Sequence, residues 1–353
     1  MKNEEMIQPS HDRTDSGSRT RRLLLHIVAG LVGVGLLGFL VWEVGVGEIL
    51  GYVRRIGWLA PLLLLPSVVI AVCDAKGWAC ALPTTVRLPH IPLWRWSLAR
   101  LAGEAVNHLT PTANLGGEPV KVYMLRAHGL PAEAGLASVV IAKTALTVSQ
   151  IVFILLGIPF FLHRLGWIQQ GWWVLGPLLL LAYGFTLLLI RWQRRGLMGA
   201  LVRLLRRLVP RWQRVVRWEE RAGEIDAHLL HFYDGNPRGF VVSTCYHFVG
   251  WLFGAIEIMI FLFLIGVPTA PTDALIIETM IQPLTVAALV IPGALGVQEA
   301  GGVFLCRLLG IDDGAGLTLM ALRRARETIY NGIGLTALMQ MGRDFLPQKA
   351  HSV

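Results

Sequence analysis

The stretch "TPTANLGGEPVKVYMLRAHGLP", residues 110–131, combines helix-breaking prolines and glycines with Glu118, Lys121 and Arg126. It lies in a chain of 353 residues that is 54% hydrophobic and only 16% charged, with a mean hydropathy of +0.57. Soluble domains are less apolar and carry more charge. The composition therefore indicates a polytopic membrane protein, in which this polar segment interrupts the apolar helices.

Six segments are apolar over the roughly 20 residues that a helix needs to cross a bilayer. They are residues 23–42, 58–82, 134–162, 172–190, 240–265 and 316–341. Two more segments, 93–130 and 273–310, are apolar but interrupted. Irregular backbone within a membrane must face protein or water, because unpaired peptide groups are costly in hydrocarbon. The sequence predicts an all-α polytopic membrane protein with about six full spans and two re-entrant broken hairpins.

Arginine residues mark the predicted cytoplasmic side. Eleven of them lie between residues 191 and 238, in the longest loop between predicted spans, and four lie in the tail 1–22. Such an excess is typical of cytoplasmic segments, so we expect this loop, the tail 1–22 and the tail 343–353 in the cytoplasm. The formal net charge of +9 is explained by this topology and requires no nucleic acid.

The same basic loop contains "GLMGALVRLLRRLVPRW", residues 196–212, with leucines on one helical face and arginines on the other. This pattern predicts a helix that lies on an anionic lipid surface. The alternative is that the arginines only set the topology, which needs no helix.

An internal repeat relates the two interrupted segments. Residues 111–143 align without a gap to residues 292–324, with nine identities in 33 positions, including Glu118 with Glu299 and Arg126 with Arg307. Each unit, 23–163 and 164–342, would hold two spans, a broken hairpin and one more span. Three crossings are an odd number, so the second unit must be inverted in the membrane. Inverted repeats with broken helices at matching positions point to a substrate site in transporters.

The motifs "LGGEPVKVYML" (115–125), "ASVVIAKT" (137–144), "PGALGVQEAGGVFL" (292–305) and "ALRRARETIYNGIG" (321–334) resemble a known family. It is the flippase-like family of the lysylphosphatidylglycerol synthase transmembrane region, which includes hopanoid-associated membrane proteins. The resemblance covers about residues 20–342. It implies movement of a lipid between leaflets of a bacterial inner membrane. Lipid aminoacylation is not expected, because no soluble synthase domain follows the last predicted span.

The candidate substrate-binding residues are charged side chains at or near the breaks. They are Glu118, Lys121, Arg126, Lys143, Glu299, Arg307 and Arg324. Ionisable residues within a membrane are costly and usually face a cavity or a partner, and a lipid phosphate would suit the cations. The alternative interpretation is structural: Glu118 and Glu299 pair with Arg126 and Arg307, while Lys143 and Arg324 pair with Glu327, Glu278 or Glu104.

Three further residues are candidates for ion coupling: Glu104, His108 and Glu278. Glu104 and His108 share a helical face that leads to the first break, and histidine titrates near neutral pH. The alternative is that His108 is a structural hydrogen-bonding residue.

The leading functional hypothesis is a flippase or transporter that moves a polar-headgroup lipid through a cavity between the two hairpins. The alternatives are an integral-membrane transferase acting on a lipid-linked substrate and a non-catalytic partner of lipid-biosynthesis enzymes, for example in a hopanoid-type pathway. Against an enzyme, the sequence has no nucleophile elbow and no metal-ligand spacing, so neither a metal nor a cofactor is expected. The nucleotide-binding motif G-x-x-x-x-G-K-[ST] is also absent.

Overall fold

The computed structural model describes residues 47, 51, 54–84, 86, 90–110, 115–126, 128–208, 215–288, 291 and 294–344. The described part is made of helices, and no strand occurs in it. An all-α fold is therefore confirmed. The predicted first span, 23–42, and the predicted tail 1–22 lie outside the described residues, as does nearly all of the predicted tail 343–353.

The described helices follow the predicted segments along the chain. They are η1 (Gly57–Leu64), α3 (Leu65–Cys80), α4 (Leu93–Leu109), α5 (Glu118–Arg126), α6 (Ala132–Arg164), α7 (Ile168–Arg194), α8 (Leu197–Leu208), α9 (Val215–Gly235), α10 (Pro237–Leu264), α11 (Pro271–Ala287), α12 (Val297–Leu308) and α13 (Asp313–Asp344).

Four helical stretches are long and apolar enough to cross a membrane. They are Arg54–Cys80, Ala132–Arg164, Leu175–Arg194 and Pro237–Leu264, and they match four of the predicted spans. The fifth predicted span in the described part, 316–341, is a helix of the required length within α13. Its apolar character is interrupted by three arginines and a glutamate in "RRARE", residues 323–327.

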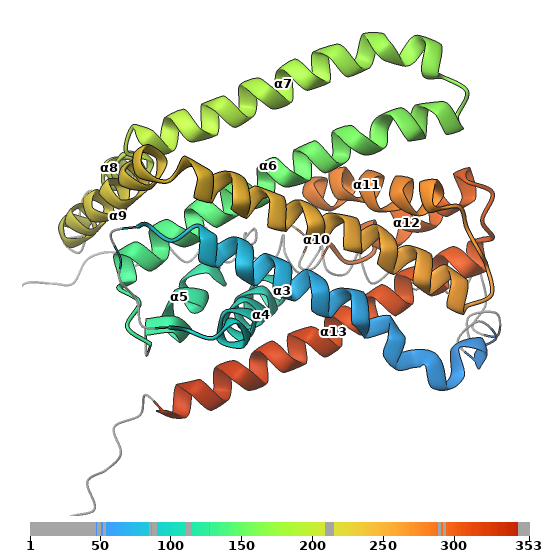
Figure 1. Ribbon diagram of the computed structural model, residues 1–353, viewed down its shortest axis with the longest axis horizontal. Coiled ribbons are helices and arrows are strands. Elements are labelled where there is room, and N and C mark those ends of the chain that lie inside the picture. Colours follow the sequence, from blue (N-terminus) through green and yellow to red (C-terminus); the bar gives the residue numbers. More distant parts are fainter. Residues whose placement is uncertain are drawn as a thin grey trace, which may run out of the picture.

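The two interrupted segments form helical hairpins, α4–α5 and α11–α12, which open toward opposite ends of α6. The α4–α5 hairpin ends at Arg126, and α6 begins soon after it at Ala132. At the other end of α6, Arg164 contacts both ends of the second hairpin. Its Nε lies 3.4 Å from Asp273 Oδ1, and its Nη2 donates to the Leu309 carbonyl at 3.0 Å. Figure 1 shows α4–α5 toward the end at which α9 lies and α11–α12 toward the other end.

The equivalent helices of the two repeats run in opposite directions. A shift of 181 residues carries α3 to residues 246–261, which lie within α10. These two helices pack together, with His247 against Gly77 and Glu257 against Ser67. The two helices are therefore antiparallel. The other packing also matches, because α4 packs on α13 and its equivalent α11 packs on α6. This geometry is that of an inverted repeat.

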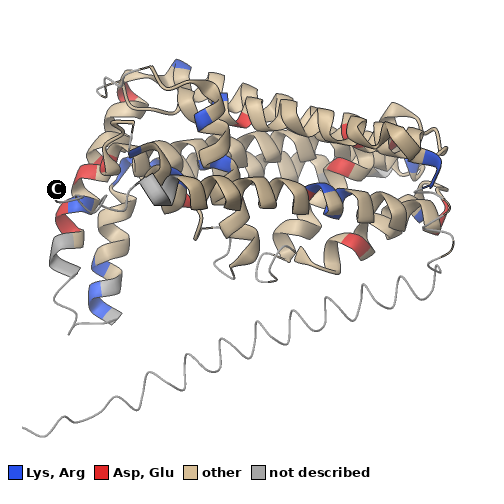
Figure 2. Ribbon diagram, turned by 90° about the horizontal axis from the view of Figure 1, so that it is seen from below, with Lys and Arg blue, Asp and Glu red and all other residues tan. Residues whose placement is uncertain are grey.

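The described parts of the basic segment form two helices, α8 and α9. The predicted amphipathic helix is present as α8, with Arg203, Arg206 and Arg207 exposed. Asp226 of α9 caps it by accepting hydrogen bonds from the backbone amides of residues 198 and 199, at 3.0 and 2.8 Å. Figure 2 shows charged residues in this projecting pair of helices and also along the helices of the bundle. Charges thus lie both at the surface and in the interior.

Candidate functional site

The first cluster of charged side chains surrounds the start of α5. Glu118, the first residue of this helix, accepts a hydrogen bond from Lys121 Nζ at 3.1 Å and lies 3.3 Å from Nζ of Lys143 on α6. Lys121 also donates to Glu104 of α4 at 2.8 Å. Glu118 and Lys121 are buried. The cluster therefore joins both arms of the first hairpin to α6.

The break before α5 is held by a close backbone contact between Gly103 and Gly117. A Cβ atom on Gly117 would lie 1.8 Å from the Gly103 carbonyl oxygen, so a larger residue does not fit there. Buried Asn107 completes the joint, because its Oδ1 accepts from the Gly117 amide at 2.7 Å and its Nδ2 donates to Glu118 at 3.4 Å. Gly103, Gly117 and Asn107 thus position the Glu118 carboxylate.

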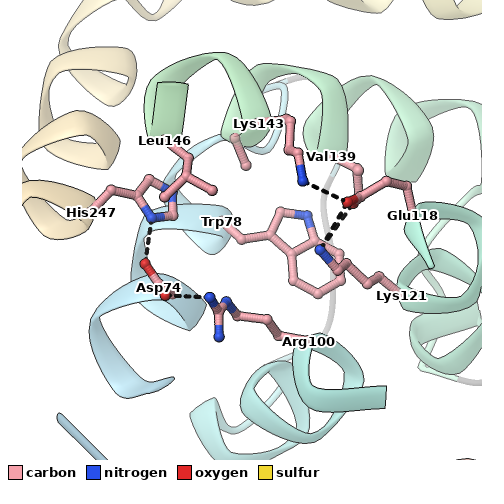
Figure 3. Close-up of a pocket in the computed structure, with 10 residues that line it drawn as sticks. Asp74, Trp78, Arg100, Glu118, Lys121, Val139, Lys143, Leu146 and His247 are labelled. Atoms are coloured by element: carbon pink, nitrogen blue, oxygen red, sulfur yellow. Dashed lines mark hydrogen bonds and ion pairs between the residues drawn. The ribbon is translucent and has the colours of Figure 1, made fainter. Parts of the chain in front are cut away.

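A cavity of about 30 Å³ lies beside this cluster. Its lining residues are Asp74, Trp78, Arg100, Glu118, Lys121, Val139, Ala142, Lys143, Leu146 and His247. The volume holds roughly two water molecules, so a lipid headgroup enters only if the surrounding helices part. In Figure 3, Trp78 separates Glu118 and its two lysines from a second group made of Asp74, Arg100 and His247.

This second group was not among the residues singled out from the sequence. Asp74 Oδ1 lies 2.6 Å from His247 Nδ1, and its other oxygen pairs with Arg100 of α4. A signal was available, because Asp74 and His247 fall within the predicted spans 58–82 and 240–265, where ionisable side chains are costly and tend to have a role.

The second cluster repeats the first in the other half of the chain. Glu299, in the first turn of α12, accepts from Arg324 Nε at 2.9 Å and from Nη2 at 2.5 Å. Its other oxygen accepts from the Gly296 amide at 2.6 Å, which caps the helix. The pairs Glu118–Lys143 and Glu299–Arg324 are each separated by 25 residues and are related by the shift of 181. Internal symmetry thus preserves one acid–base pair at each break.

A second pocket accompanies this pair, but its side chains fill it, and its volume for a water-sized molecule is about 0 Å³. Its lining residues are Gln298, Glu299, Met320, Arg323, Arg324 and Glu327. Five of these six positions are equivalent, by the shift of 181, to residues that line the first cavity: 118 with 299, 139 with 320, 142 with 323, 143 with 324, and 146 with 327. The two cavities are therefore the same structural site in two copies, with no lining residue in common.

Each copy also holds ion pairs of its own. In the second repeat, Arg323 pairs with Glu278 at 2.5 Å and Arg326 with Glu257 at 2.9 Å, and Arg324 also reaches Glu327 at 2.8 Å. The shift places Ala142 and Ala145 at the positions of Arg323 and Arg326, so the first repeat does not reproduce these pairs.

The remaining sequence candidates lie outside the two clusters. Arg126 is exposed at the end of α5, and Arg307 of α12 pairs with Asp313, the first residue of α13. The alternative pairing of the two glutamates with Arg126 and Arg307 is therefore wrong, because the cations on α6 and α13 take that place. His108 Nδ1 lies 3.1 Å from Asn331 Oδ1 of α13, a contact that fits the structural interpretation of this histidine.

The first cluster, taken together with the neighbouring group of Asp74, Arg100 and His247, is balanced in charge. The combined set contains the carboxylates of Asp74, Glu104 and Glu118, and the cations Arg100, Lys121 and Lys143. A further charge in such a set is costly unless it replaces an internal partner or is neutralised by a change of protonation.

The comparisons with known proteins agree with the architecture. Residues 26–334 match the family described as "Lysylphosphatidylglycerol synthase TM region". A "UPF0104 membrane protein" from Methanothermobacter thermautotrophicus (strain ATCC 29096 / DSM 1053 / JCM 10044 / NBRC 100330 / Delta H) is 28% identical over 144 residues, which cover 39% of this chain and 42% of that protein. The aligned part thus spans less than half of the relative's length. No solved structure matches the chain. Since the family match covers most of the chain, the protein belongs to the lysylphosphatidylglycerol synthase TM region family.

Proposed function

We propose that this integral membrane protein moves a polar-headgroup lipid between the two leaflets of the membrane. The observation that carries the proposal is the repetition of one acid–base pair, Glu118–Lys143 and Glu299–Arg324, at the breaks of two hairpins that open in opposite directions. In transporters built from inverted repeats, broken helices at matching positions line the substrate site, and rocking of one repeat against the other exposes that site to each side in turn.

The ion pairs supply a mechanism for binding. A headgroup that carries a phosphate exchanges for Glu118 or Glu299 as the partner of the cation on α6 or α13. Because the cavities are small in this structure, the exchange requires the hairpin to move away from the long helix that follows it. Rocking of one repeat against the other would open one cluster and close its counterpart.

The acyl chains would remain in the hydrocarbon. Large apolar side chains of α6 are exposed at Val152, Leu156 and Phe160, and nearly all of the apolar stretch of α7 is exposed. These surfaces suit contact with lipid tails. On this proposal the end of the bundle with α8 and α9 faces the cytoplasm of a bacterial cell, and the arginines of α8 rest on the anionic inner leaflet.

The proposal is tested with purified protein in vesicles of phosphatidylethanolamine and phosphatidylglycerol, at about 3:1, the acidic lipid supplying the negative surface. Fluorescent analogues of both lipids are added in trace amounts, and dithionite reduces the analogues in the outer leaflet. Wild-type protein should raise the dithionite-accessible fraction above the half that protein-free vesicles show.

Three variants sharpen the test. Glu118→Gln and Glu299→Gln should each slow translocation about tenfold, because the carboxylate that displaces the phosphate from the cation is lost and the headgroup is released more slowly; a tenfold change corresponds to about 1.4 kcal/mol. Arg307→Ala, which changes an exposed pair outside both clusters, should match the wild type. Equal rates in vesicles with and without the wild-type protein would contradict the proposed function.

A further inference from the structure

His247 connects the first cluster to the opposite repeat. It lies on α10, whereas the Asp74 carboxylate that it contacts lies on α3 and the Arg100 that completes the group lies on α4. His247 also packs closely on α3, because a Cβ atom on Gly77 would lie 2.8 Å from His247 Nε2. The interaction thus crosses the interface between the repeats, where any rocking motion must occur.

One nitrogen of this buried histidine has no partner. Nδ1 faces the Asp74 carboxylate at 2.6 Å, so Nδ1 carries the proton and donates. Nε2 is buried and has no hydrogen-bond partner among the residues that the structure describes. His247 also lines the first cavity. A buried polar atom without a partner requires an explanation, and an ion bound in another state is one that the nitrogen lone pair of a cavity-lining residue allows.

The charges around His247 determine the charge of the ligand that the first cavity can bind. From α3 it faces Asp74, which is neutralised by Arg100 of α4, and across the cavity α6 presents Lys143, paired with Glu118. The cluster as a whole balances three carboxylates against three cations while the imidazole is neutral. Protonation of Nε2 would add one positive charge and turn this atom from an acceptor into a donor. The added charge is compensated if an anion enters the cavity at the same time.

We propose that His247 is a proton-binding site whose occupancy is linked to the binding of an anionic phosphate group in the first cavity. Binding of the phosphate promotes proton uptake at Nε2, and by linkage protonation strengthens phosphate binding. The proton comes from water and returns to water when the phosphate leaves, so no covalent step is involved. The inference rests on the proposed function, because it names the headgroup chemistry and the coupling of the same site.

The first experiment measures proton uptake directly. Purified full-length protein in weakly buffered detergent solution, containing a pH-indicator dye, is mixed with short-chain phosphatidylglycerol, and separately with inorganic phosphate to distinguish a lipid headgroup from a free anion. Wild-type protein should take up protons on binding the lipid, to a limit of one per chain, because phosphate binding and protonation are linked. His247→Gln should take up none, and His231→Gln, on exposed α9, should behave as the wild type. Uptake with inorganic phosphate alone would assign the site to a free anion.

The second experiment measures translocation of fluorescent phosphatidylglycerol in the vesicles described above, between about pH 5.5 and pH 8.5, the range in which histidine changes charge. The rate for the wild type should rise at least about threefold as the pH falls through this range, because protonation favours the anionic headgroup. The rate for His247→Gln should be independent of pH, and zwitterionic phosphatidylcholine should show no pH dependence.

The two proposals fail separately. If the wild type takes up a proton on binding phosphatidylglycerol but moves no lipid, the proton site stands and the proposed function falls. If lipid moves and His247→Gln keeps both the proton uptake and the pH profile of the wild type, the present inference is overturned.

Discussion

The pairing of Glu118 with Lys143 predicts a large energetic coupling between these two residues. At the 3.3 Å that separates them, the Coulomb attraction is about 5 kcal/mol for an effective dielectric constant of about 20. Much of this attraction offsets the cost of removing the charges from water, so we expect a net coupling of about 2 kcal/mol. Interhelical hydrogen bonds in membranes average only about 0.6 kcal/mol in the same kind of measurement.

The assay is a double-mutant cycle on the free energy of unfolding. Glu118→Gln leaves three cations with two carboxylates, and Lys143→Met leaves three carboxylates with two cations. Each single change should destabilise the protein by about 3 kcal/mol, because it leaves an uncompensated charge in a mostly buried cluster. The double variant restores the balance and should cost about 2 kcal/mol less than the sum of the single changes.

The measurement is reversible unfolding in mixed detergent micelles, followed by tryptophan fluorescence. The pair Glu299–Arg324 should show a coupling at least as large, since its separation is only 2.5 Å. The matched control is Arg194–Asp234, whose side chains are 48% and 54% exposed, and its coupling should stay below about 1 kcal/mol. Additive effects at Glu118 and Lys143, within about 0.5 kcal/mol, would refute the reasoning.

Three further predictions concern stability, measured in the same unfolding assay. Gly334→Ala should cost about 1–3 kcal/mol or more, because its Cβ would lie 2.3 Å from the Leu101 carbonyl oxygen where α13 crosses α4. Gly332→Ala is its control and should be neutral or slightly stabilising, since no atom lies within 4 Å of that position; equal effects of the two changes would contradict the close crossing. Asn107→Ala should cost about 1–3 kcal/mol, because it leaves the Gly117 amide unpaired, and a cost close to zero would show that the α4–α5 break does not depend on it. Arg307→Ala should cost less than about 1 kcal/mol because the pair with Asp313 is exposed. A larger loss of stability would contradict the weak contribution expected of this pair.

Much of the fold follows from patterns that the sequence displays openly. Apolar length predicts the spans, because only a helix satisfies its own backbone in lipid. The match of residues 111–143 to residues 292–324 predicts the inverted repeat, and the structure places the equivalent helices α3 and α10 antiparallel. The arginine and leucine faces of residues 196–212 predict α8. These are local or periodic features, so one sequence suffices to read them.

The partners within the site could not be predicted with the same success. Glu118 lies nearer in sequence to Arg126 than to Lys143, but Arg126 is exposed at the far end of α5, and α6 brings Lys143 to the start of α5. The choice among cations is thus made by helix packing. For the same reason Asp74 and His247, 173 residues apart, come together only through the α3–α10 interface.

The presence of two separate pockets could not be predicted from the sequence either. The sequence suggested one cavity lined by both hairpins, but each hairpin packs against the long helix that follows it and forms its own small cavity. This arrangement depends on close contacts such as that between Gly103 and Gly117, which a repeat pattern does not reveal.

Side-specific labelling tests the central claim most directly. The claim is that the two equivalent cavities serve opposite faces of the membrane. Single cysteines are introduced at Val139 and Met320, which line the two cavities at equivalent positions, in a protein whose four native cysteines are replaced by alanine. Impermeant maleimides are then applied from either side of oriented vesicles during lipid translocation. The account predicts labelling of position 139 only from the side of α8 and α9, and of position 320 only from the opposite side. Labelling of both positions from one side, or of neither during translocation, would contradict it.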